Sequence, residues 1–514
     1  MPAPLTTIEE TEEVDDAGLA AYRTPRSDVV EERDEGGGRF GLENGPFSHY
    51  QRTLDVETSG DGTHAVTHRV EFRLAVGSWW RLFQLPMRRT LRRAGGRPPW
   101  WAPPQVLDAQ AAASLASLAY LSIVAGYLGT LITQSLTYAA DEFGADDGQQ
   151  ANTLAAIRIG VLLSLGIAAW ADRHGRRRAL LACATGGCLL TAFGAAVPGL
   201  IALGTTQTFA RGLSTALGLL IVVVVAEEMP AGARAYGVSL LTMSGALGAG
   251  MVLWILPLVE VDERAWRILY VVPLLFLPLI SSTAKLLPES RRFVRRHAAA
   301  KFAGHGRRLA LLAGTTFALA ILSTPASQLQ NEFLREEFSF TAAHITLFTI
   351  LTVTPASIGI VVGGRLADLR GKRLIGGIGL GVGAVLTAAQ FVTTSVELVW
   401  TVATIGSIFG GLAVPALAIY GPELFPTALR TKANVVMTIL GVCGSVLGLV
   451  IVGYLSDRWS LGPAIAVLAV APLLATLFLI PRYPETAHKE LEELNPEDDL
   501  PPGALGNVGP GPGF

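Results

Sequence analysis

The sequence predicts an all-α membrane protein with about 12 transmembrane helices in two six-helix halves, preceded by a long N-terminal tail. Three observations lead to this prediction. Half of the 514 residues are hydrophobic and only 16% are charged, unlike soluble domains. Apolar runs of about 20 residues, each able to cross a ~30 Å hydrocarbon core as a helix, recur from residue 109 to residue 480. Several motifs also return at one fixed distance along the chain.

Residues 1–107 are polar and rich in glycine, glutamate and aspartate, so we expect a mostly disordered cytoplasmic tail. One alternating run, RVEFRLAV, is compatible with an isolated strand. The tail ends in a segment with paired tryptophans and five arginines, which is typical of an interfacial anchor on an anionic leaflet; a regulatory role is the alternative. The acidic start lacks the apolar core of a signal peptide, so the tail is expected to stay on the side of synthesis.

The apolar runs divide into an N-terminal half at 108–290 and a C-terminal half at 309–482, joined by a cytoplasmic central loop at 291–308. An acidic tail at 483–514 is expected to be disordered. The candidate spans are roughly 110–140, 151–171, 178–197, 199–226, 237–258, 265–287, 309–333, 344–366, 374–394, 397–422, 433–456 and 461–481.

The loops alternate in charge along the chain. Those near 141–150, 259–264 and 335–343 are mostly acidic, whereas those near 172–178, 288–308 and 365–373 are basic. Basic loops are retained in the cytoplasm, so we expect both termini to be cytoplasmic in a multi-pass protein of the plasma (inner) membrane. The lipid bilayer is the expected environment, and a monomer is the expected state.

The repeated motifs all share one offset. "ADRHGRR" at 171–177 returns as "ADLRGKR" at 367–373, so that Asp368 follows Asp172 by 196 residues. The same offset relates "EEMPAGAR" to "ELFPTALR" and "PES" to "PET". A constant offset across the chain indicates a duplicated six-span unit with parallel topology, as in transporters whose halves rock about a substrate path.

These motifs resemble those of the major facilitator superfamily, and within it the sugar porter and related metabolite symporter branch. The superfamily pattern G-x-L-x-D-R-x-G-R-R is matched by "AAWADRHGRR" and by "GRLADLRGKR", with Ala168 and Leu369 as departures. "PESRRF", "YGPELFPTALR" and "PETAHKELEEL" are similar in order and position, and the resemblance covers residues ~110 to 492. It implies the major facilitator fold and transport by alternating access.

Charged residues at the cytoplasmic helix ends form the candidate conformational gate. Carboxylates there can pair with guanidiniums across the two halves and release them when the protein opens inward. Family members use these residues as a conformational network, and the resemblance implies the same here; arginines that only fix topology are the alternative. The gate set is Asp172, Arg173, Gly175, Arg176, Glu227, Arg234, Glu289, Gly364, Asp368, Gly371, Arg373, Glu423, Arg430 and Glu485.

Polar residues inside the spans form the candidate substrate and coupling set. Arg211 lies deep in the fourth span, where a charge requires a wet cavity or a partner. A polar face on the first span has a counterpart near the end of the seventh; helix–helix hydrogen bonding is the alternative for both. Arg158 either serves the path or snorkels to the surface. The set is Tyr127, Thr130, Gln134, Arg158, Gln207, Arg211, Gln330, Asn331 and Glu332.

The sequence gives no indication of catalysis, of cofactor or metal binding, or of nucleic-acid binding. It contains no Walker A lysine motif, nucleophile elbow or cluster of metal ligands, so we expect no enzyme activity, cofactor or metal, and no nucleic-acid partner. The glycine-rich run "GGIGLGVGA" lies inside an apolar span and indicates helix packing. Energy for transport must therefore come from gradients.

The predicted function is secondary active or facilitative transport of a small polar solute, sugar-like or a small organic metabolite. Proton-coupled sugar porters have an acid in the first span where this chain has Leu128, so a coupling proton would need another acid, such as Glu332. Arg211 without that acid could instead meet an anionic metabolite. The alternatives are a drug or metabolite exporter of the same superfamily, and a non-transporting nutrient sensor that signals through the tail.

Overall fold

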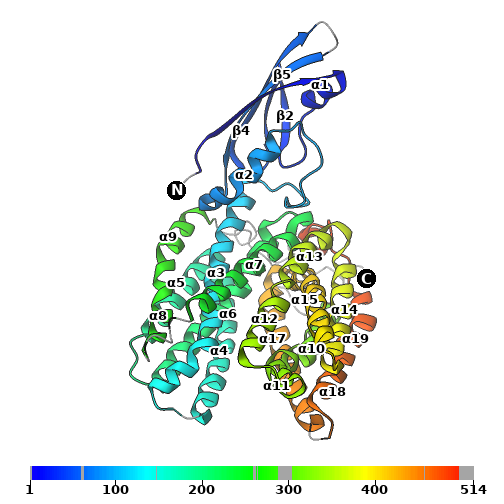
Figure 1. The fold of residues 1–514 in the computed structure, drawn as a ribbon. Helices are drawn as coiled ribbons and strands as arrows, with labels where there is room; N and C mark the ends of the chain where they lie inside the picture. The colour runs from blue at the N-terminus through cyan, green and yellow to red at the C-terminus, as the bar shows by residue number, and fades with distance from the viewer. Residues whose placement is uncertain are drawn as a thin grey trace.

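The structure, a computed structural model, describes residues 3–59, 63–145, 147–256, 258, 262, 264–287, 304–456 and 458–496. It consists of a bundle of long helices and a smaller domain, built around a β-sheet, that is seated on one end of the bundle (Figure 1). We call this end the domain end of the bundle.

The N-terminal domain is folded, so the prediction of a mostly disordered tail was wrong. It contains one antiparallel sheet in the order β1-β5-β4-β3-β2. The short run that predicted an isolated strand belongs to β5. Its elements are β1 (Thr6–Val14), α1 (Asp16–Arg23), β2 (Glu31–Gly36), β3 (Arg39–Asn44), β4 (Phe47–Ser59), β5 (Thr63–Leu74) and α2 (Trp80–Leu91).

One face of the sheet is buried. The average composition of residues 1–107, from which disorder was predicted, does not reveal this face. Along β5 every second residue from Val66 to Leu74 is buried, the period expected of a half-buried strand. The charged residues that suggested disorder are partly internal and paired. Arg52 and Glu32 are buried, with Nη2 and Oε2 2.6 Å apart, and Arg52 also donates to the carbonyl of Tyr22.

The bundle contains twelve helical segments, as predicted. Within the described chain, ten are long and apolar enough to cross a membrane, and α4 and α5, which carry arginines at their ends, supply the other two. The first half comprises α3 (Ala109–Glu142), α4 (Asp147–His174), α5 (Arg176–Gly194), α6 (Leu200–Glu228), α7 (Arg234–Ile255), and a broken sixth segment of α8 (Trp266–Val271), η4 (Val272–Phe276) and α9 (Leu277–Leu286).

The second half follows the same order, with three further breaks near prolines, which lack the N–H that a continuous helix needs. Its segments are α10 (Gly306–Gln328) with α11 (Gln330–Phe338), α12 (Ala342–Val353) with α13 (Ala356–Arg370), α14 (Lys372–Val392), α15 (Val396–Ala418) with α16 (Tyr420–Glu423), α17 (Thr427–Ser456), and α18 (Leu461–Ala466), η5 (Val467–Ala469), α19 (Val470–Leu474), η6 (Ala475–Leu479) and η7 (Ile480–Arg482).

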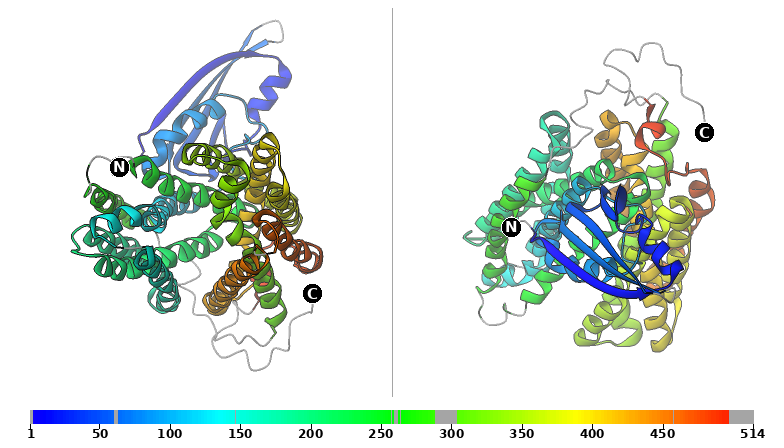
Figure 2. Two further views of the ribbon diagram at one scale, coloured as in Figure 1. Left: turned by 60° about the horizontal axis from the view of Figure 1, so that its bottom comes forward. Right: turned by 90° about the horizontal axis from the view of Figure 1, so that it is seen from above.

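The duplication is visible in the packing as well as in the sequence. In the first half α3 packs on α7 while α4 and α5 pack on α6; in the second half α10 packs on α17 while α13 and α14 pack on α15. Gly248 and Gly444, which are 196 residues apart, lie against the carbonyls of Ile123 and Phe317, where a side chain would overlap. Seen from above, the N-terminal domain lies over elements of both halves (Figure 2).

The C-terminal tail is only partly as predicted. Residues 483–496 pack against the domain end and include α20 (Leu491–Leu494), with Thr486, Leu491 and Asn495 buried. Disorder was therefore the wrong prediction for this part, because polar residues of the segment bind the gate described below. Residues 497–514, and most of the central loop at 291–308, lie outside the described residues.

Candidate transport gate and substrate path

Two glycines set the turns that position the gate at the domain end. Gly175 separates α4 from α5 and Gly371 separates α13 from α14, with φ/ψ of 105°/137° and 106°/133°. A residue with a side chain rarely adopts a positive φ of this size. A cation follows each glycine directly: Arg176 is the first residue of α5 and Lys372 is the first residue of α14.

Two buried glutamates cross-link the halves in a reciprocal manner. Glu227 of α6 is paired with Arg430 of the second half, and Glu423 of α16 is paired with Arg234 of the first half through an Oε1 to Nη1 distance of 3.4 Å. Each residue follows its counterpart by 196 positions. The side chains are at most 1% exposed, so these ion pairs are shielded from water.

Each glutamate also binds a cation of its own half. Arg176 is paired with Glu227, and Lys372 Nζ lies 2.6 Å from Glu423 Oε1, all four side chains being buried. Each of these two glutamates thus contacts one cation of its own half and one cation of the opposite half. Such an arrangement can hold the halves together without leaving a buried carboxylate unpaired when they part.

Asp368 adds a third link between the halves. Its carboxylate, fully buried at the end of α13, accepts hydrogen bonds from the backbone N–H groups of Ala235 (3.2 Å) and Tyr236 (2.8 Å) at the start of α7. A carboxylate at a helix N-terminus satisfies otherwise unpaired N–H groups and the positive end of the helix dipole. Next to it, Gly364 lets α13 approach α7, because a Cβ there would lie 2.6 Å from Ser239 Oγ.

The C-terminal segment supports the second copy of the gate. Thr486 Oγ1 donates to Glu423 Oε2 at 2.6 Å, and Glu490 Oε2 lies 3.0 Å from Arg234 Nη2. Glu485 accepts from the backbone N–H groups of Lys372 and Arg373, which caps α14. The gate therefore includes a segment that lies beyond both helical halves.

The structure differs from the predicted gate at several positions. Arg173 is exposed, and the Arg373 guanidinium donates to the carbonyl of Pro481 instead of pairing with a carboxylate, so the predicted pairings were wrong for these two arginines. Lys372 was missed, although it follows Arg176 by 196 residues. The side chain of Asp172, in α4, and the whole of Glu289 lie outside the described residues.

Arg211 lies between the first and fourth spans. The side chain is half-buried and its guanidinium donates to the carbonyl of Gly129 in α3. The following residue, Thr130, and Gln134 one turn further are also half-buried. A cation, a hydroxyl and an amide are thus gathered along one stretch of α3 and α6.

Two predicted path residues instead pack inside the first half. Tyr127 is fully buried and its hydroxyl donates to the carbonyl of Leu269 at 2.7 Å, while Gln207 is buried beside Gly194 and Tyr270. The prediction of a path position was therefore wrong for these two side chains. For Tyr127 the alternative of helix–helix hydrogen bonding holds, because a backbone carbonyl satisfies the hydroxyl.

The remaining candidates cannot be compared with the prediction. Gln330 is half-buried at the start of α11, just after the helix breaks at Leu329. The side chains of Arg158, Asn331 and Glu332 lie outside the described residues, so their roles remain predictions.

At the end opposite the domain end, the first half is closed by an ionic cluster. Glu142 Oε1 lies 2.9 Å from Arg267 Nη2, and its Oε2 accepts from the indole N–H of Trp266 at 2.6 Å. Burial alone would raise the pKa of Glu142, but hydrogen bonds from Arg267 and Trp266, together with the charges of Arg267 and Arg264, outweigh it and lower the pKa. The cluster joins α3 to α8 within one half.

Two halves of six helices, related by a parallel repeat and held together at one end by reciprocal ion pairs, form an arrangement that many secondary transporters have. The family model described as Major Facilitator Superfamily matches residues 309–505. An MFS-type transporter of Bacillus subtilis, YybF, is 27% identical over 174 residues, and this match covers 34% of the present chain and 42% of that protein. Both matches extend over part of the chain, and they confirm the resemblance to this superfamily that is seen in the sequence.

Solved structures show the same fold at low sequence identity. The proton:xylose symporter XylE bound to 6-bromo-6-deoxy-D-glucose matches with a TM-score of 0.59 and 17% identity, covering 74% of this chain and 98% of that chain. The E. coli fucose:proton symporter FucP matches with a TM-score of 0.57 and 15% identity, over 72% and 98%. The human organic anion transporter MFSD10 (TETRAN) matches with a TM-score of 0.58 and 14% identity, over 72% and 99%.

Proposed function

We propose that the protein carries a small polar solute across the plasma membrane by alternating access, as a monomer, with its domain end in the cytoplasm. The observation that supports this proposal is the reciprocal pairing of Glu227 with Arg430 and of Glu423 with Arg234 across the two halves. The basic loops beside these pairs favour the cytoplasmic orientation.

The energetics of the gate suit a protein that must both close and open. Removing one partner from a buried ion pair costs about 3–5 kcal/mol, because the other charge is left buried. When the halves separate, water reaches all of these groups at once, so the loss of the ion pairs is offset by hydration of the charges. A difference of a few kcal/mol is enough to change which of two states is populated.

The substrate class is inferred from the residues between the first and fourth spans. Arg211, Thr130 and Gln134 offer a cation, a hydroxyl and an amide, which suit a sugar-like molecule or a small organic metabolite. The fold is shared with two proton:sugar symporters and an organic anion transporter, which supports both classes. Leu128 stands where sugar porters have an acid, so we propose that Glu332 is the coupling acid if protons drive transport.

Uptake by the purified protein in liposomes tests this function. Labelled sugars and organic acids are supplied with and without an imposed proton gradient. Accumulation that collapses with the gradient identifies a symporter, and equilibration without accumulation identifies a facilitator; either result supports the proposal. Arg211→Gln should abolish uptake, whereas Arg482→Gln, the same change at an exposed arginine, serves as the control. Absence of uptake for the whole panel in protein of normal stability would contradict the proposal.

A second candidate, a nutrient sensor, is favoured by one observation: the N-terminal region is a folded domain in contact with both halves of the bundle. A sensor would bind a substrate of the panel without moving it into liposomes. Equilibrium binding without uptake would therefore select this candidate, and uptake would exclude it.

A further inference from the structure

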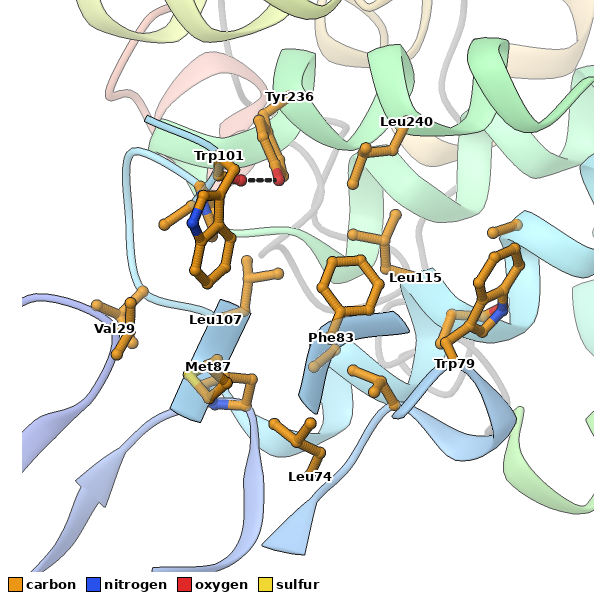
Figure 3. A pocket seen from close by; sticks show the side chains of 18 of the residues that line it. Val29, Leu74, Trp79, Phe83, Met87, Trp101, Leu107, Leu115, Tyr236 and Leu240 are labelled. Atoms are coloured by element: carbon orange, nitrogen blue, oxygen red, sulfur yellow. Dashed lines mark hydrogen bonds between the residues drawn. The ribbon is translucent and has the colours of Figure 1, made fainter. Parts of the chain in front are cut away.

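A cavity of 190 Å³ lies where the N-terminal domain meets the first half of the bundle. Figure 3 shows Phe83 of α2 and Leu115 of α3 directed into one space, with Leu240 of α7 above them and Trp101 at its side. The walls thus come from the domain, from two transmembrane helices and from the linker between them.

The polar groups at the edge of this cavity already have partners. Asp28 is paired with Arg26 at 2.8 Å, with both side chains buried. The hydroxyl of Ser244 donates to the carbonyl of Leu240, and that of Tyr236 donates to the carbonyl of Trp101. The rest of the lining is aliphatic, aromatic or methionine, so a molecule bound there gains from apolar contact and needs no charge.

The size of the cavity restricts the shape of such a molecule. An apolar cavity of roughly 150 Å³ accepts benzene in another protein, so 190 Å³ suits one or two rings. A phospholipid acyl chain is as long as one leaflet, about 15 Å, and would require an extended channel. The volume of the cavity therefore favours the compact molecule.

One wall of the cavity is also a tie between the two halves. We call residues 99–105 the strap. Arg365 of α13 donates to the carbonyls of Trp100 (2.8 Å) and Ala102, and Tyr236 of α7 donates to the carbonyl of Trp101 at 2.6 Å. The strap therefore binds the first half through α7 and the second half through α13.

This double attachment couples the cavity to the transport cycle, an argument that rests on the proposed function. If the domain end opens, α7 and α13 separate, and the strap cannot keep both sets of hydrogen bonds. Trp101 and Ala102 line the cavity, so its shape must then change. A ligand that fits the cavity with the strap in place binds the closed state more tightly and increases its population.

We propose that this cavity is a regulatory site for an uncharged aromatic molecule of one or two rings, and that its occupancy holds the domain end closed. The site lies outside the path between the first and fourth spans. It provides a way for a small lipophilic compound to slow the carrier without competing with a polar substrate.

Photolabelling of the full-length protein in phosphatidylcholine nanodiscs tests the site. The probe is a naphthalene that bears a diazirine, with plain naphthalene as competitor. We expect competed labelling on peptides that contain Phe83, Trp101 or Leu115. Ala119→Phe, which fills the cavity from α3, should reduce labelling about tenfold, equivalent to about 1.4 kcal/mol of binding. Ala113→Phe, on α3 but outside the lining, should retain it.

The effect on conformation is measured separately, by the distance between spin labels at His174 in α4 and Lys432 in α17. Naphthalene should shift the distances toward the shorter population in the wild type and in Ala113→Phe, but not in Ala119→Phe. Labelling that is not competed, or that survives in Ala119→Phe, would overturn the proposal, as would labelling of the same peptides by a diazirine phosphatidylcholine only. Neither readout requires transport, so a failed uptake assay would leave this result interpretable.

Discussion

At the domain end the two halves of the bundle use equivalent residues in equivalent roles, whereas at the opposite end they use different chemistry. Arg176 and Lys372, Glu227 and Glu423, and Arg234 and Arg430 are pairs of positions 196 residues apart, and each pair occupies the same place in the gate. The same offset leads from Glu142 to Phe338 and from Arg267 to Pro463 at the other end.

The opposite end shows which interactions join helices within one half. Glu142 and Arg267 close the first half by an ion pair, but Phe338 packs between Phe333 and Phe340, with ring centroids 5.8 and 5.7 Å away. Either chemistry can join helices within one half. At the domain end, by contrast, both halves keep the same charged residues, because each half must pair with the other. We infer that pairing between the halves, and not packing within a half, has kept these charges alike.

The largest effect is expected when Glu423, the carboxylate that binds a cation from each half, is neutralised. Glu423→Gln removes the carboxylate that Lys372 and Arg234 share and leaves them only Asp368, at 3.9 Å, and Glu490, which should cost up to about 3–5 kcal/mol of the closed state. We expect uptake to fall and the distance between labels at the domain end to lengthen. Glu142→Gln is the matched change at the opposite end and should leave both measurements unchanged. Equal effects of the two substitutions would contradict the comparison.

A smaller difference should separate the two cross-linking arginines. Arg234→Ala removes the pairs with Glu423 and Glu490 and a hydrogen bond to the carbonyl of Lys489, whereas Arg430→Ala removes the pair with Glu227 and a hydrogen bond to Phe425. Because a hydrogen bond to a charged group contributes about 1.5–3 kcal/mol, Arg234→Ala should impair transport more.

Uptake by the two variants, normalised to the amount of folded protein at matched thermal stability, measures this difference. Normal uptake in Arg234→Ala would exclude a role for the reciprocal pairs in gating.

A further test concerns the support from the C-terminal segment. Thr486→Val removes the hydroxyl that donates to Glu423 while keeping the shape of the side chain. We expect a loss of about 1.5 kcal/mol from the closed state, measured as the ratio of short to long label distances. Thr352→Val is the control, because the hydroxyl of this buried threonine in α12 donates to the carbonyl of Phe348 in the same helix. No change in the ratio would mean that the C-terminal segment is not part of the gate.

The smallest effect is expected from acid at the opposite end. The lowered pKa of Glu142 means that the folded state binds a proton less readily than the unfolded chain. The stability that this group contributes is thus present above the unfolded pKa of about 4.3 and is lost as pH falls through the lowered value. Thermal unfolding below pH 5 should be less pH-dependent in Glu142→Gln, and a wild-type slope in that variant would argue against the pair.

The gate could be predicted because its charges stand out in an apolar sequence and recur at one offset. Lys372 escaped notice because it was grouped with the topology-setting cations, and only the structure shows that its Nζ contacts Glu423. Tyr127 was assigned to the substrate path because helical periodicity shows which residues share a face of the helix. Periodicity does not show what that face packs against. Its neighbour is the carbonyl of Leu269, which belongs to a span 142 residues away.

The N-terminal domain shows why mean composition fails for small sheets. Acidic and basic residues lower the average hydrophobicity of residues 1–107, but buried pairs such as Arg52 with Glu32 and Arg26 with Asp28 compensate one another inside the domain. The alternation along β5 was visible in the sequence. The other four strands of its sheet were not, because pairing between distant strands leaves no local pattern.

The most direct test of the account is the label distance between His174 and Lys432, measured in liposomes after replacing the exposed Cys443 with serine. The wild type is expected to show mainly the short distance of the closed domain end. The double variant Glu227→Gln with Glu423→Gln should populate a second, longer distance, because both reciprocal links are weakened. Identical distance distributions in the two proteins would contradict the claim that these ion pairs hold the halves together.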